Sequence, residues 1–211
     1  MSTIQLNVKS QGNLSRISEQ EIQKTAKILA QGFLEDPMFS LIFPKYETRL
    51  QALNAFFQPF VADGVKRGEV VLAPESQGVS IWYPPEVSVF DAQFEEMLAE
   101  IMSIASHFGG LEAAEQFEQL ANKVGANEPT TPRSEVLWIV VLAQSRGKGI
   151  GGSLLLPALN CADTKKVGCY LVSSNPRNIS FYQRHGFQKN CSIQVSDTYS
   201  MTGMWRHPVE A

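Results

Sequence analysis

The sequence predicts an α/β (α+β) fold in which strands and helices alternate along a single chain of 211 residues. The main observation is a change in hydrophobic period, from a repeat of about 3.6 residues in some segments to a repeat of about two in others. The first period is typical of amphipathic helices and the second of half-buried strands. Composition agrees, since 44% of the residues are hydrophobic and 18% are charged, unlike a disordered chain.

The N-terminal segment is predicted to form a strand followed by a helix. Residues 1–10 alternate apolar and polar side chains and lack the continuous apolar run of a secretion signal. Ser18 and Glu21 have the spacing of a capping box, so a helix should begin there. Pro37 is expected to end this helix, because a proline inside a helix removes a backbone hydrogen bond.

A second helix and a β-hairpin are predicted next. Apolar side chains recur at helical spacing over residues 46–66, and Pro59 within this segment predicts a kink. Residues 69–73 and 78–83 are apolar, β-branched runs separated by Pro-Glu-Ser-Gln. Two such runs joined by a short polar segment are typical of a hairpin.

The middle of the chain is predicted to be a helical hairpin inserted between strands. Residues 92–123 have helical spacing that is interrupted at Gly109 and Gly110. Residues 125–134 are polar, contain two prolines and predict a loop.

The last third of the chain alternates strands and helices again. Pro157 is expected to interrupt the first of its helices unless it lies near the first turn. Gly186 is expected to end the second helix. The predicted strands cover residues 136–143, 167–173, 187–193 and 200–205, and the predicted helices cover residues 153–166 and 176–185.

Charge and cysteine content limit the expected partners. Eighteen Lys and Arg against 21 Asp and Glu give a formal net charge of -3, without the basic excess of nucleic-acid-binding proteins. No apolar stretch approaches the roughly 18 residues of a membrane helix, so no membrane partner is expected. Cys161, Cys169 and Cys191 lack the spacing of a disulfide framework or a zinc site. We therefore expect reduced thiols, no metal and a cytoplasmic protein.

A glycine-rich segment joins a predicted strand to a predicted helix. Glycines at such a place let backbone N–H groups approach a ligand at the positive end of the helix, which suits a pyrophosphate. Basic side chains in the segment would reinforce the binding. The predicted binding residues are Arg146, Gly147, Lys148, Gly149, Ile150, Gly151 and Gly152.

Several interpretations of this segment compete. A Walker A loop is disfavoured because Gly149, and not Ser or Thr, follows Lys148. A dinucleotide fingerprint is matched by Gly147, Gly149 and Gly152, but the next strand lacks the acidic residue that would hold a ribose. The Arg-x-x-Gly-x-Gly pattern of coenzyme A transferases begins at Arg146. A solvated surface turn also fits, so the segment alone does not decide.

A second candidate element lies in the helix predicted over residues 176–185. Asn178 and Tyr182 are four residues apart and therefore share one face of that helix. A phenol is protonated at neutral pH and can donate a proton to a departing thiolate. The alternative is that the Tyr182 ring only packs against the sheet.

Three ordered blocks resemble the Gcn5-related N-acetyltransferase (GNAT) family. They are the strand at residues 136–141, the loop at 146–151 and the segment Asn-Ile-Ser-Phe-Tyr-Gln-Arg-His-Gly-Phe at 178–187. Within this family the chain looks most like the puromycin N-acetyltransferase type. The motifs concerned are Trp-Tyr-Pro-Pro at residues 82–85, Leu-Leu-Pro-Ala-Leu at 155–159 and Asn-Pro-Arg-Asn at 175–178.

The resemblance implies a fold and a reaction. The fold would be a mixed, mostly antiparallel sheet, splayed in the middle and flanked by helices, with the helical hairpin inserted before the central strand. Acetyl-CoA would be the co-substrate, and a primary amine of a small molecule the acceptor. The pyrophosphate would bind the glycine-rich loop, the pantetheine arm would pair with Ile139, Val140 and Val141, Asn178 would contact pantetheine, and Tyr182 would lie near the sulfur.

The resemblance also divides the chain into parts of a single domain, residues 1–211. Residues 1–134 would hold the acceptor-site helices, residues 135–193 the acetyl-CoA-binding core, and residues 194–211 the closing strand and tail. We allow for a homodimer of this domain.

The chain departs from the family pattern at the expected base. Many relatives carry Glu two residues after the aromatic of the second strand, where this chain has Val172. Glu135, beside the first strand, is the nearest acidic substitute, or else a solvated strand-end charge. Phe33, Trp82 and Tyr83 are candidates to line the acceptor pocket. The alternative function is a module that senses acetyl-CoA and has lost its chemistry.

Overall fold

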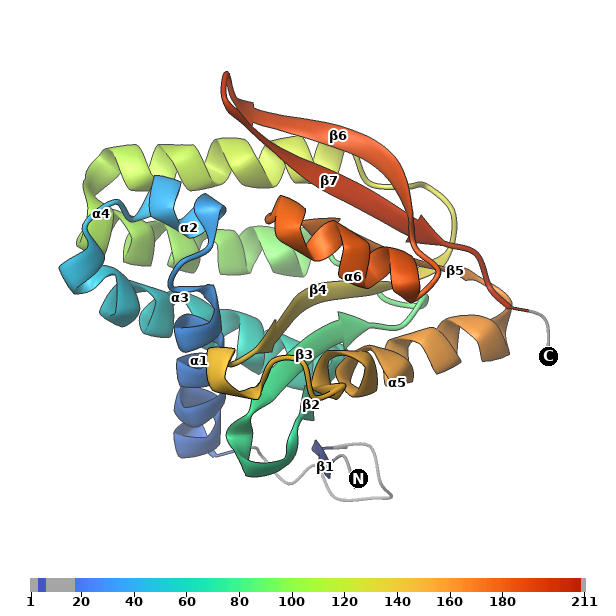
Figure 1. The fold of residues 1–211 in the computed structure, drawn as a ribbon. Coiled ribbons are helices and arrows are strands. Elements are labelled where there is room, and N and C mark those ends of the chain that lie inside the picture. The colour runs from blue at the N-terminus through green and yellow to red at the C-terminus, as the bar shows by residue number, and fades with distance from the viewer. Residues whose placement is uncertain (1–3, 7–17, 210–211) are drawn as a thin grey trace.

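The computed structural model describes residues 4–6 and 18–209. Its strands form one open sheet in the order β1-β2-β3-β4-β5-β7-β6 (Figure 1). The strands are β1 (Ile4–Leu6), β2 (Glu69–Leu72), β3 (Gly78–Tyr83), β4 (Arg133–Val141), β5 (Gly168–Ser173), β6 (Gln188–Ser196) and β7 (Tyr199–Arg206). Among these described strands, only the β4–β5 pair is parallel. The mixed, mostly antiparallel sheet predicted from the resemblance is therefore confirmed.

The sheet separates between its two central strands. The parallel register of β4 and β5 runs from Arg133 beside Gly168 to Val136 beside Leu171 and ends there. Beyond this point β4 continues to Val141 paired with β3, while β5 continues to Ser173 paired with β7. The C-terminal half of β4 consequently has one edge that does not pair with β5.

Helices cover both faces of the sheet (Figure 1). One face carries α1 (Glu19–Phe33), α2 (Pro37–Ile42), α3 (Tyr46–Arg67) and α4 (Ala92–Ala126), whose apolar side chains share the larger core cluster. The other face carries α5 (Ile150–Lys165), with the short α6 (Ile179–Arg184) contributing Tyr182 to the second cluster. None of the described helices is long and apolar enough to cross a membrane.

The predicted helical hairpin is confirmed, and glycines explain its bend. Gly110 in α4 has φ +80° and ψ 179°, so two helical arms meet there. A Cβ on the preceding Gly109 would lie 2.4 Å from the Cβ of Ala113. Glycine is therefore required at the bend both for its backbone conformation and for close approach of the next turn.

Several element boundaries differ from the prediction. The capping box of Ser18 and Glu21 is present, but α1 ends at Phe33, before Pro37. Pro37 instead begins α2, a helix that the sequence patterns did not predict. The side chain of Asp36 caps this helix by accepting a hydrogen bond from the N–H of Met38 at 3.0 Å. A proline at the first helical position costs no hydrogen bond, so Pro37 is a start signal here.

Tertiary contacts explain two further differences from the prediction, one at the start of β4 and one inside α5. The predicted loop at residues 125–134 is shorter, because Arg133 and Ser134 already pair with Gly168 and Cys169. Helix α5 begins at Ile150 and contains Pro157 in its interior. Burial of the neighbouring apolar side chains outweighs the hydrogen bond that the proline removes.

Candidate functional site

A cavity of about 590 Å³ lies where β4 separates from β5. This larger cavity is bounded by the C-terminal half of β4, the loop into α5, the first turn of α5, the end of α1 and helix α6. Its volume falls within the range of about 300 to 1,000 Å³ that is usual for ligand pockets. The separation of β4 from β5 therefore leaves a cavity that is large enough for a small-molecule ligand.

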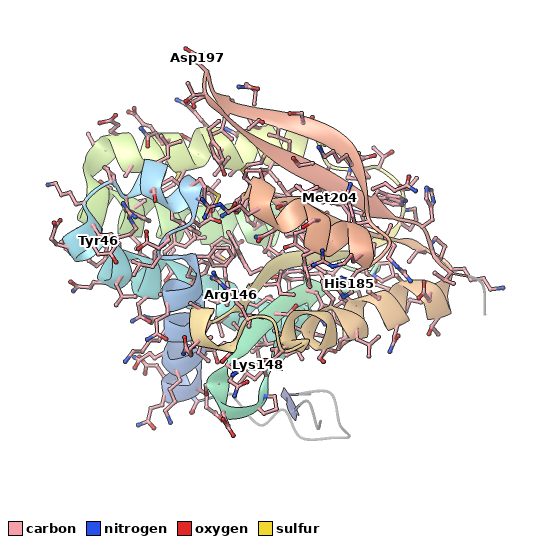
Figure 2. The ribbon with its side chains drawn as sticks, viewed as in Figure 1. Tyr46, Arg146, Lys148, His185, Asp197 and Met204 are labelled. Atoms are coloured by element: carbon pink, nitrogen blue, oxygen red, sulfur yellow. The ribbon has the colours of Figure 1, made fainter. Side chains whose placement is uncertain are left out.

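The structure brings the predicted cofactor residues together at this cavity, with Lys148 as the exception. The residues that line it are Ile139, Val140, Val141, Arg146, Gly147, Gly149, Ile150, Gly151, Gly152, Asn178 and Tyr182. Lys148 is exposed and lies outside the lining. Figure 2 shows Arg146 and Lys148 on the loop that leads into α5.

The loop has the backbone conformation of an anion site. Gly147 and Gly149 have φ values of +77° and +79°, a region that favours glycine, and a Cβ on either would meet no atom within 4 Å. Gly149 is the N-cap of α5 and offers no side chain to the first N–H groups of that helix. These N–H groups and the positive end of the helix dipole therefore remain free for a phosphate.

Charged side chains at the larger cavity include three arginines, namely Arg146, Arg177 and Arg184. Glu35 and Asp36 also line it. The Nε of exposed Arg146 donates to the carbonyl of Val141 at 3.2 Å, which holds the guanidinium near the loop. The three guanidinium groups suit a ligand that carries several phosphates.

Helix α6 approaches α5 closely at two further glycines. A Cβ on Gly151 would lie 2.9 Å from Cζ of Phe181, and one on Gly152 would lie 2.9 Å from Nε2 of His185. The other ring nitrogen of His185, Nδ1, is 2.8 Å from the carbonyl oxygen of Phe181. Figure 2 shows His185 at the end of α6, beside α5. These two glycines allow the first turn of α5 to lie close to the helix that carries Tyr182.

Tyr182 is buried at the inner end of the larger cavity. Its side chain is 6% exposed, and its ring packs against Phe187 at 6.0 Å between centroids. Burial raises the pKa of Tyr182 well above its usual value, and the charge of Asp36 raises it further. A phenol that stays protonated at neutral pH therefore lies at the cavity.

A second cavity, of about 90 Å³, continues on the other side of Tyr182. It lies among α1, α3, α4, β4 and β5, and most of its lining is apolar. The residues that line both cavities are Phe33, Ile139, Asn178 and Tyr182. Two ligands, one in each cavity, would therefore meet at Asn178 and Tyr182.

Glu135 lines the smaller cavity. Its side chain forms an ion pair with Arg133 at 2.8 Å, and Arg133 also pairs with Glu128 at 2.8 Å. Burial raises the pKa of Glu135 to about 8; repulsion from Glu128 adds to the rise, while Arg133 opposes it. Val172, the position at which many relatives carry Glu, lines the same cavity. A carboxyl group therefore reaches this space from β4, although β5 supplies none.

The other substrate candidates have different positions. Phe33 lines both cavities, whereas Trp82 and Tyr83 line neither. Trp82 is buried in the cluster beneath α5. Tyr83 is fully buried, and its hydroxyl donates to Asp63 at 2.6 Å, beside Arg67. Their place at the end of β3 gave no indication of the face on which each ring would lie.

A hydrogen bond that the sequence patterns did not predict joins the linings of the two cavities. The hydroxyl of Ser174, just after β5, donates to the Asp36 carboxylate at 2.8 Å. Burial raises the pKa of Asp36, and its hydrogen bonds to Ser174 and to the N–H of Met38 oppose that rise. Tyr199 of β7 donates to the carbonyl of Ser174 at 2.7 Å. The Asp36-Pro37 pair is a helix-start signal that could have revealed part of this link.

The described residues include no group of three or more His, Cys, Asp or Glu side chains that could hold a metal ion. Cys169 is buried, and burial raises the pKa of its thiol to about 12. A thiol of this kind is a poor nucleophile at neutral pH.

Known proteins were compared with this chain at the level of family, sequence and structure. Residues 112–189 match the family model described as an acetyltransferase (GNAT) domain. An uncharacterized N-acetyltransferase of Schizosaccharomyces pombe is 24% identical over 189 residues, covering 86% of this chain and 76% of that protein.

Solved structures share the fold over almost the whole chain. A histone acetyltransferase HPA2 and related acetyltransferase from Corynebacterium glutamicum has a TM-score of 0.65 and 21% identity, covering 92% of this chain and 95% of that one. Arylalkylamine N-acetyltransferase 2 from Aedes aegypti has a TM-score of 0.56 and 13% identity, covering 90% and 96%. The family-model match is thus confined to residues 112–189, whereas the likeness to these solved structures is one of fold and extends over nearly the whole chain.

Proposed function

We propose that this protein is an acetyl-CoA-dependent N-acetyltransferase that acts on a primary amine of a small molecule. The observation that carries the proposal is the meeting of two cavities at Tyr182. One cavity has an anion-binding loop, and the other has a buried carboxyl group. The likeness to the puromycin N-acetyltransferase type rests on sequence motifs alone and does not by itself name the amine.

The residues of the larger cavity fit a coenzyme A thioester. The N–H groups at the start of α5 and the three arginines would hold the pyrophosphate. The free edge of β4 at Ile139 and Val141 offers backbone groups to the amide-containing arm, and Asn178 adds an amide side chain where the two cavities meet. The thioester would then lie beside Tyr182.

Glu135 and Tyr182 would handle the two protons of the reaction. An alkylammonium group, with a pKa near 10, must lose a proton before its nitrogen can attack, and Glu135 would accept it. The amine nitrogen forms a bond to the thioester carbonyl carbon while the carbon–sulfur bond breaks. The electron pair of that bond leaves on sulfur, and Tyr182 would donate its proton to the thiolate. The second proton that the nitrogen loses as the amide forms would return to Tyr182, and the proton on Glu135 would pass to solvent. Transfer is direct, with no acetylated enzyme.

The test is amine-dependent release of CoA thiol by the parent protein and by Glu135→Gln. We expect the substitution to lower kcat/KM by about 10²- to 10⁴-fold, the usual range for a general base. Val172→Glu in the Glu135→Gln background should restore part of the loss, because both side chains line the same cavity. Leu111→Gln, on the exposed side of α4, is the control.

The outcomes separate the enzyme from an acetyl-CoA sensor. Acetyl-CoA binding without thiol release for any amine would favour the sensor. Thiol release that is unchanged in Glu135→Gln would retain the enzyme but remove Glu135 from its mechanism.

A further inference from the structure

The lining, volume and charge of the smaller cavity indicate what kind of amine could bind there. The inference rests on the proposed function, because it takes this cavity to be the acceptor site. Aromatic rings from several elements form much of its wall, among them Phe33 of α1, Phe60 of α3, Phe94 and Phe117 of α4, and Trp138 of β4. A wall of this composition favours an apolar ligand body.

These rings hold one another in place. Trp138 lies 5.4 Å from Phe33 and 5.1 Å from Phe60, measured between ring centroids. Phe117 lies 5.0 Å from Phe56, which is fully buried. Close-packed interiors resist expansion, so the wall should keep its dimensions when a ligand binds.

The volume limits the size of the ligand part that can lie inside the smaller cavity. An apolar cavity of about 150 Å³ holds benzene, a ring of six carbons. In proportion, the cavity of about 90 Å³ accommodates about four carbons. A phenyl ring on an alkyl chain exceeds this space.

The charged side chains of the lining limit how many charges the ligand can carry. Among the described residues that line the smaller cavity, Glu135 is the only one with a formally charged side chain, and it is 5% exposed. Its partner Arg133 lies outside the lining. One ammonium group can meet this carboxyl group, but a second charge would be buried among aromatic rings without a partner, which is costly.

We propose that the acceptor is a short aliphatic monoamine, with one primary amino group on an uncharged hydrocarbon chain of about four carbons. The hydrocarbon chain of the amine occupies the smaller cavity, and its amino group faces Glu135. Larger arylalkylamines and polyamines are poor acceptors.

The test measures kcat/KM for n-alkylamines from ethyl to octyl, for 1,4-diaminobutane and for 2-phenylethylamine. Each added methylene should raise kcat/KM about fourfold up to butylamine or pentylamine, after which the values should fall. Diaminobutane should be poorer than butylamine by on the order of a hundredfold, because of its second charge. Equal or better turnover of the diamine or the arylalkylamine would overturn the proposal.

A matched pair of variants tests whether the hydrocarbon chain of the amine lies in the smaller cavity. Phe117→Leu enlarges the cavity, so the highest kcat/KM should move to an amine that is one or two carbons longer. Phe43→Leu is the control, because Phe43 is also buried against Phe56 but does not line the cavity. An optimum that stays unchanged in Phe117→Leu, or that shifts equally in both variants, would contradict the assignment.

A binding measurement separates this inference from the proposed function. Calorimetry of n-butylammonium and 1,4-diammoniobutane chlorides against the CoA-loaded protein needs no turnover. Preferential binding of butylammonium without CoA release would support the cavity assignment and contradict the enzyme. Glu135-dependent turnover of other amines, without alkylamine binding, would support the enzyme and overturn the inference.

Discussion

The chemistry of Glu135 follows from its position in the short parallel ladder between β4 and β5. Glu135 lies beside Tyr170 in that ladder and opposite Tyr83 of β3, so neighbouring strands cover it on both sides. Arg133 and Glu128 are its charged neighbours. Burial next to a second carboxylate disfavours the ionised form, which brings the pKa of Glu135 closer to that of an amine.

This position predicts the pH dependence of the reaction. Since the base must be ionised, kcat/KM should rise with pH through the pKa of Glu135, about 8. Glu128→Gln removes the repulsion and leaves Arg133 to Glu135 alone, so both effects should move the inflection to lower pH. A pH–rate profile of the parent and this variant checks the shift. An unchanged or higher inflection would contradict the role of Glu128.

Tyr182→Phe should separate catalysis from cofactor binding. The substitution keeps the ring and its contact with Phe187 but removes the proton donor. Acetyl-CoA affinity by calorimetry should barely change, while kcat falls by about 10- to 1,000-fold. The loss should be smaller with an acyl donor whose thiol is more acidic. Parent-like kcat in this variant would mean that another group protonates the thiolate.

At the scale of elements, the glycines in the loop before α5 and in the first turn of α5 serve two purposes. Gly147 provides a left-handed backbone with open space around it, whereas Gly151 lets Phe181 of α6 approach α5. Gly147→Ala should weaken acetyl-CoA binding and cost about 1 kcal/mol of stability, because of its positive φ.

Gly151→Ala should act differently, because its new methyl group would displace Phe181, the neighbour of Tyr182. We expect kcat to fall more than acetyl-CoA affinity. Calorimetry and kcat, measured for both variants, test this division. The same ratio of the two losses in both variants would show that the two glycines share one role.

Local patterns predicted most elements. The missed helix α2 has a local start signal at Pro37, whereas tertiary contacts explain the early start of β4 and the tolerance of Pro157 in α5. The capping box at Ser18, the hairpin bend at Gly110 and the loop before α5 each depend on neighbours in sequence. By contrast, the smaller cavity is lined by residues of α1, α2, α3, α4, β4, β5, α6 and β7, which meet only in the fold. Sequence alone could name Glu135 but could not place it opposite the α4 rings or beside Glu128.

At the scale of the whole molecule, the split sheet determines how the two ligands would meet. The end of the β4–β5 ladder opens the larger cavity, and helices α1, α3 and α4 enclose the smaller one on the opposite face. Tyr182 and Asn178 line both. An acetyl group in one cavity would lie next to an amine in the other, so direct transfer requires no intermediate on the protein.

Direct transfer is tested by one single-turnover measurement with acetyl-CoA that is labelled in the acetyl group. The protein is first incubated with labelled acetyl-CoA alone, and n-butylamine is then added while label and CoA thiol are followed. The proposed function predicts no CoA release and no label on the protein before the amine is added, followed by equal amounts of CoA and N-acetylated amine, which is N-acetylbutylamine if the inferred acceptor class is also correct. Label bound covalently to the protein before the amine is added, or no transfer to this or any other amine, would contradict it.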